Sequence, residues 1–236
     1  MIGGFEAPRR LSRRRAAAAE PVDVTCATVI GAEPHAEERQ AQAWMERADG
    51  IVADALAVLN RALHARRIAA ADPYGGELAP RHALVTRVGY GTGAQVAEGR
   101  WTVARELTAP RDRPAREAAL RPQERFAALL SGRDVAPACE LLALRARLDL
   151  DQARAREAAL QTEAALGAAL TELEGWRELP GMPERLDELR SFAAAIAAAG
   201  AAARAGALDK EACVVVEQAL GRLEAALRAR TAGASF

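Results

Sequence analysis

The chain has 236 residues, of which 50% are apolar and only 4% aromatic. Because 32 basic residues balance 32 acidic ones, the formal net charge is zero, and no overall field directs the protein to nucleic acid or membranes. Lys210 is the only lysine, which excludes almost all lysine-dependent chemistry and is typical of a GC-rich bacterial genome. Alanine is abundant and lets helices approach closely at a small cost in side-chain entropy, so we expect packed helices.

Residues 1–20 form an arginine-rich tail without apolar periodicity, and we expect this tail to be disordered. Its arginines are Arg9, Arg10, Arg13, Arg14 and Arg15. They indicate either a solvated end or an electrostatic contact with nucleic acid, an acidic partner or anionic lipid. No long apolar segment follows, so the sequence predicts neither an export signal nor a membrane span, and we expect a cytoplasmic protein.

Residues 21–109 predict a small α+β unit. Alternating apolar residues predict a strand over 22–30, and apolar residues spaced three to four apart predict a long helix from about Pro34 to Ala69, bent at Asp49 and Gly50. Two more strands are expected over 83–88 and 100–107. The predicted order is β-α-β-β, with the helix covering one face of the sheet.

The loop between the last two expected strands contains Gly89, Gly91 and Gly93. Glycines in this pattern suggest a loop whose backbone N–H groups bind an anion. The loop lacks the Gly-Lys-Ser/Thr of a P-loop and the spacing of a dinucleotide-binding turn. We therefore favour a flexible hairpin loop, and keep a nucleotide- or anion-binding domain as the alternative.

Residues 110–122 predict a linker between domains, because prolines oppose regular structure there and arginines favour solvent. The arginines that would extend the positive charge of the tail are Arg111, Arg113 and Arg116. Tail and linker together would form the electrostatic footprint of a nucleic-acid-associated factor, which is the alternative functional hypothesis.

Residues 123–230 predict a C-terminal antiparallel helical bundle of about four helices, which makes the fold class α-rich α+β. A short helix is expected over 123–130. Leu141, Leu144 and Leu148 then recur at i, i+3 and i+7 and predict the first helix of a helical hairpin over 138–174. Two further helices follow, separated by Gly206, and the last one begins at the N-cap residue Asp209.

The hairpin resembles one unit of a tetratricopeptide array. The resemblance lies in the turn from Leu148 to Arg154, followed by Ala158 or Ala159, where a small residue would let the two helices close. No second copy is visible at the period of that family, so a generic helical hairpin is the preferred interpretation.

Catalytic groups do not converge in the sequence. His35, His64 and His82 are not spaced for metal binding, and the helical half contains no histidine to serve as a general acid or base. The cysteines form no paired motif and are interpreted as reduced core residues: Cys26, Cys139 and Cys213. We expect no catalytic residue, cofactor or metal.

The leading hypothesis is therefore a non-enzymatic, cytoplasmic interaction or scaffold protein. Helix faces rich in alanine and leucine offer surfaces for a protein partner or for self-association.

Overall fold

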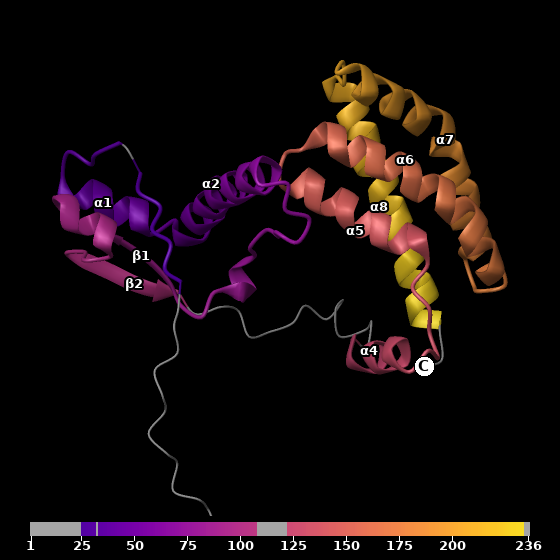
Figure 1. Ribbon diagram of the computed structural model, residues 1–236, viewed down its shortest axis with the longest axis horizontal. Helices are drawn as coiled ribbons and strands as arrows, with labels where there is room; N and C mark the ends of the chain where they lie inside the picture. Colours follow the sequence, from indigo (N-terminus) through magenta and orange to yellow (C-terminus); the bar gives the residue numbers. More distant parts are fainter. Residues whose placement is uncertain (1–24, 32, 108–121, 234–236) are drawn as a thin grey trace, which may run out of the picture.

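Two groups of elements follow one another along the chain (Figure 1), and this computed structural model describes residues 25–31, 33–107 and 122–233. The first group comprises helices α1 (Glu38–Met45) and α2 (Ala48–Ala69), 3-10 turns η1 (Pro80–His82) and η2 (Ala94–Glu98), and strands β1 (Thr86–Tyr90) and β2 (Val103–Leu107). The second group comprises helices α4 (Pro122–Leu130), α5 (Ala138–Asp151) and α6 (Ala155–Glu172), 3-10 turn η3 (Leu173–Trp176), and helices α7 (Met182–Ala205) and α8 (Lys210–Gly233). The chain is mostly helical, as expected.

The sheet of the first group is a single antiparallel pair, in which Thr86 of β1 faces Leu107 of β2 and Tyr90 faces Val103. The predicted β-α-β-β order is not confirmed. The part of the first predicted strand that the structure describes, residues 25–30, forms no strand. Its Ile30 is 54% exposed, so the apolar alternation in this segment does not correspond to a face buried against a core.

The long helix predicted from Pro34 to Ala69 is divided in two. The division falls at Glu46 and Arg47, and Gly50, where a bend was expected, lies inside α2 with regular helical structure. The buried amide of Asn60 on α2 holds the following loop: its Nδ2 donates to the Leu78 carbonyl at 3.0 Å, and its Oδ1 accepts from the Leu78 N–H at 2.8 Å. A polar residue thus connects α2 to the chain that leads into β1.

The four helices α5 to α8 form an antiparallel arrangement in which α8 contacts α5, α6 and α7. Figure 1 shows α8 passing behind α5 and α6. The predicted hairpin and the two later helices are confirmed. Gly206 ends α7 with a φ of 77°, in the left-handed region that favours glycine. Asp209 caps α8 as predicted, because its Oδ1 accepts a hydrogen bond of 2.8 Å from the Ala212 N–H.

The packed face of α5 is not the one that carries Leu141, Leu144 and Leu148. Small residues of α5 face the bundle instead, where Cys139, Ala143 and Ala146 are at most 2% exposed. Three leucines lie on the opposite side, with the following exposed fractions: Leu141 52%, Leu144 65% and Leu148 38%. The other two, Leu142 and Leu150, pack against the core. The facing residues of α6 are also mostly alanine, and small side chains on both helices allow a close approach.

The large core side chains come from the other helices. Leu186 and Leu189 of α7 and Leu220 and Leu223 of α8 are fully buried.

The three cysteines differ in burial: Cys139 is buried, Cys213 is partly buried and Cys26 is exposed, so the interpretation of Cys26 as a core residue is wrong.

Leucine-to-alanine substitutions distinguish the buried leucines of the core from the exposed leucines of α5. We expect Leu220→Ala to lower the free energy of unfolding by about 2–5 kcal/mol, because it leaves a cavity in the core. We expect Leu144→Ala to change it by less than about 0.5 kcal/mol, because that side chain is already in solvent. Urea denaturation followed by circular dichroism measures both, at a protein concentration low enough to exclude self-association. A loss at Leu144 as large as that at Leu220 would contradict the observed orientation of α5.

Candidate functional site

A groove between α5 and α8 contains a cavity of about 300 Å³. Side chains spaced three and four residues apart on each helix form its walls, and Arg125 of α4 lies at one end. The lining residues are Arg125, Glu140, Ala143, Leu144, Glu224, Leu227, Arg228 and Thr231. Because Leu144 also belongs to the exposed leucines of α5, the groove is continuous with an apolar surface.

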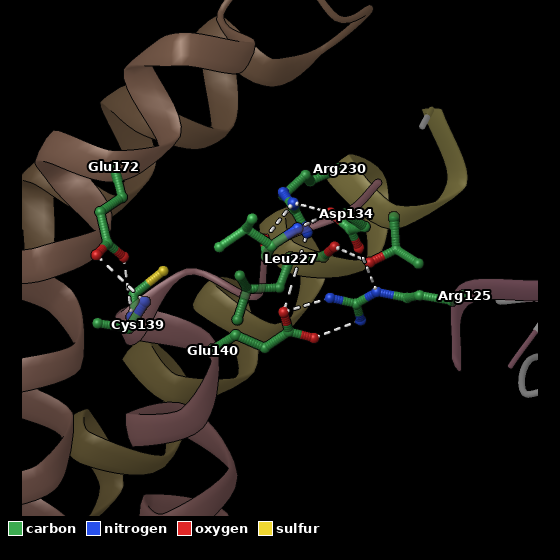
Figure 2. A network of polar contacts seen from close by, with 10 residues as sticks. Arg125, Asp134, Cys139, Glu140, Glu172, Leu227 and Arg230 are labelled. Atoms are coloured by element: carbon green, nitrogen blue, oxygen red, sulfur yellow. Dashed lines mark hydrogen bonds and ion pairs between the residues drawn. The ribbon is translucent and has the colours of Figure 1, made fainter. Parts of the chain in front are cut away.

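A network of ion pairs at one end of the groove joins α4, the loop after it, α5 and α8 (Figure 2). The two amino groups of Arg125 donate to the two carboxylate oxygens of Glu140, and the Arg125 Nε donates to Asp134 at 3.2 Å. Asp134 also accepts a hydrogen bond from the Arg230 Nη2 at 2.7 Å. Two guanidinium groups and two carboxylates therefore neutralise one another.

Arg230 is the most buried member of this network, with 3% of the residue exposed. Its Nη2 donates to the Val135 carbonyl at 3.0 Å as well as to Asp134, and its guanidinium lies over the Trp176 ring at 4.4 Å. The Nη1 atom is 3.9 Å from a Glu140 oxygen. A charge this deeply buried requires such partners, so the network holds α4 and the following loop against the end of the bundle.

The electrostatics of the network favour ionised groups. Burial alone would raise the pKa of the Asp134 carboxyl, but hydrogen bonds from Arg230 and Arg125 outweigh this effect and hold the pKa below its usual value. Asp134 is therefore a carboxylate at neutral pH with its oxygens already bonded. Such a group is poorly suited to general acid or base catalysis, which needs a pKa near the working pH.

Cys139 lies near the network but has no nucleophilic character. Burial, followed by the nearby Glu172 carboxylate, raises the pKa of its thiol to about 12. The Glu172 carboxylate accepts hydrogen bonds from the backbone N–H groups of Cys139 at 2.9 Å and of Ala138 at 3.2 Å, so it caps the first turn of α5. Since the thiolate is the reactive form, Cys139 is chemically inert at neutral pH.

Arg228 has a different environment from the other arginines of the groove. Arg147 is bonded to Glu224, with 2.7 Å between Nε and Oε1, and Arg125 and Arg230 belong to the network. Arg228 is only partly exposed, lines the cavity, and makes no ion pair with any residue in the described ranges. Among the described residues, the end of the groove near the network therefore carries a positive charge that no carboxylate neutralises.

The arginines proposed from the sequence for contact with nucleic acid lie outside the described residues. This applies to the tail and to the linker alike, so their role stays a prediction: Arg9, Arg10, Arg13, Arg14, Arg15, Arg111, Arg113 and Arg116.

Of the three glycines of the predicted loop, Gly89 lies within β1, and Gly91 and Gly93 lie between β1 and β2, away from this groove in sequence and structure. A Cβ atom at Gly89 would lie 2.6 Å from the Trp101 ring and 2.5 Å from the Val103 carbonyl oxygen. A Cβ at Gly91 would lie 3.0 Å from the Thr102 nitrogen, and Gly93 has a φ of 80°. Close packing and backbone conformation thus account for the three glycines, and anion binding there stays a prediction.

No family model, curated protein or solved structure matches this chain. In the described part of the chain, no group of three or more His, Cys, Asp or Glu residues is arranged to hold a metal ion. Among the same residues, no helix has both the length and the apolar character that crossing a membrane requires.

Sequence reasoning missed the ion-pair network, because no local pattern connects its members. Asp134 and Arg230 are separated by 96 positions. The signal in the sequence was the position of Arg230, three residues after Leu227 and seven after Leu223, which places an arginine on the apolar side of α8.

We expect Arg230→Met to lower the free energy of unfolding by about 3–5 kcal/mol, because it leaves the Asp134 carboxylate, whose side chain is only 9% exposed, without its closest partner. Arg222→Met is the matched control. Arg222 also lies on α8 and pairs with Glu188 at 3.0 Å, but both side chains are substantially exposed, so a change below about 1 kcal/mol is expected. Urea denaturation measures both variants, and equal losses would show that the network contributes no more than a surface pair.

Proposed function

We propose that this chain is a non-enzymatic, cytoplasmic interaction protein, and that its binding surface is the leucine stripe, which consists of Leu141, Leu144 and Leu148 on α5. The proposal rests on the orientation of these three leucines. These leucines point away from the bundle on a helix whose opposite side is fully buried. The regular spacing along one helix makes them a continuous apolar surface instead of scattered exposed residues.

The surroundings of the stripe support binding. Leu144 borders the groove between α5 and α8, and α4 adds Phe126 and Leu130, which are 63% and 74% exposed. Burying a leucine side chain contributes about 1.5–3 kcal/mol relative to leaving it in water. A partner helix with apolar residues at the same spacing would cover the stripe and fill the groove, which is a common mode of helix recognition.

The chemistry of the groove also supports binding over catalysis. The carboxylates of Asp134, Glu140 and Glu224 are each bonded to an arginine, and the nearest thiol, that of Cys139, has a strongly raised pKa. These groups give the groove shape and rigidity and leave no free nucleophile among its lining residues.

Leu144→Asp tests this function. The purified protein, with a tag that distinguishes it from the endogenous copy, would be used to capture proteins from a lysate of the source organism. We expect the wild-type chain to retain at least one protein that Leu144→Asp does not retain, because the charge cannot be buried against an apolar partner. Mass spectrometry with isotope labelling identifies and quantifies the captured proteins.

The matched control is Leu84→Asp, since Leu84 is 86% exposed and lies outside the bundle, just before β1. It should capture the same proteins as the wild-type chain. Identical captured sets for the wild-type chain and Leu144→Asp would contradict the proposed function.

A further inference from the structure

We infer that the leucine stripe binds a second copy of this chain, with the two α5 helices antiparallel about a two-fold axis near Leu144. This inference rests on the proposed function, and it adds the identity of the partner. The stripe is suited to such pairing because Leu141 and Leu148 lie on either side of Leu144. An antiparallel arrangement therefore brings Leu141 of each copy beside the Leu148 of its partner, in the manner of two helices that interlock at a 3-4 spacing.

The charges at the two ends of the stripe are opposite. At the Leu141 end, Arg228 lines the groove without an ion pair to any described residue. At the Leu148 end, Asp151 follows one turn further along α5, with 60% of its side chain exposed and only a 3.9 Å contact to Arg147. Glu217 adds negative charge near the same end. Glu224 does most to raise the pKa of Arg147, burial opposes this effect, and Asp151 and then Glu217 raise the pKa further.

A two-fold axis exchanges these ends. The contacts of Arg147 with Glu224 and of Arg230 with Glu140 show that α5 and α8 run antiparallel, which places Arg228 at the level of Leu141. In the antiparallel pair, the positive end of each copy then faces the negative end of its partner. A parallel pair would instead bring Arg228 beside Arg228, where like charges repel.

The remaining charges are compatible with this arrangement. Arg145 lies next to Leu144, near the axis, and is exposed, so its long side chain can direct its guanidinium to solvent. The whole chain has a formal net charge of zero, so two copies approach without overall repulsion. A uniformly acidic or basic partner helix would match one end of the stripe and be repelled at the other.

Sedimentation velocity over a range of concentrations tests the pairing on the full chain. We expect the wild-type protein to show a reversible monomer–dimer equilibrium. Arg228→Asp and Asp151→Arg should each weaken the dimer about tenfold or more, because each brings like charges together across the axis. The double variant with both substitutions should recover most of the lost affinity. Arg61→Asp, an equal charge change on the exposed face of α2, should leave the equilibrium unchanged.

Three outcomes would overturn the inference: a wild-type chain that stays monomeric at every concentration, single variants that dimerise as well as the wild type, or a double variant that is weaker than either single one. Circular dichroism of each variant shows whether it is folded. If the wild-type chain is monomeric but captures another protein that Leu144→Asp does not capture, the second copy is rejected as the partner and the proposed function stands. A wild-type chain that does not dimerise and captures the same proteins as Leu144→Asp would reject both.

Discussion

Close contact between α5 and α6 through alanine is the constraint on which the rest of the bundle depends. Ala143 and Ala146 on α5 meet a face of α6 that includes Ala158 and Ala159, and all four side chains are almost completely buried. Helices can approach closely only where side chains are small, and Leu141, Leu144 and Leu148 lie outside this contact. They are placed on the outer side, and the apolar surface proposed for binding is a direct consequence of how the hairpin closes.

The ion-pair network completes the groove that adjoins this surface. Hydrogen bonds from Arg230 and Arg125 to Asp134 hold the loop after α4 against α8, and Glu140 fixes Arg125 beside α5. Buried ion pairs add little net stability compared with apolar packing, but they fix geometry because each partner requires the others. We interpret the network as the element that positions α4, with its exposed Phe126 and Leu130, at the end of the groove.

Local signals in the sequence predicted much of the helical half, because caps and turns depend on neighbouring residues. Asp209 and Gly206 are placed as expected. The orientation of α5 could not be obtained in this way, since leucine and alanine stripes have the same periodicity and only contact with α6 selects between them. The alternation before Ile30 predicts a strand, but no neighbouring strand pairs with the part of this segment that the structure describes. The candidate site depends on contacts between distant residues, such as Asp134 with Arg230, which no local pattern contains.

The most direct test of this account is the reactivity of single cysteines introduced on the two sides of α5. Leu144→Cys and Ala146→Cys would be compared in a Cys26→Ser, Cys213→Ser background, at a protein concentration low enough to keep the chain monomeric. Labelling by a maleimide, followed by mass spectrometry, should be fast at position 144, as for the exposed Cys26 of the wild-type chain, and slow at position 146, as for the buried Cys139. Fast labelling at 146 with protection at 144 would mean that α5 turns its leucines inward, and the proposed binding surface would not exist.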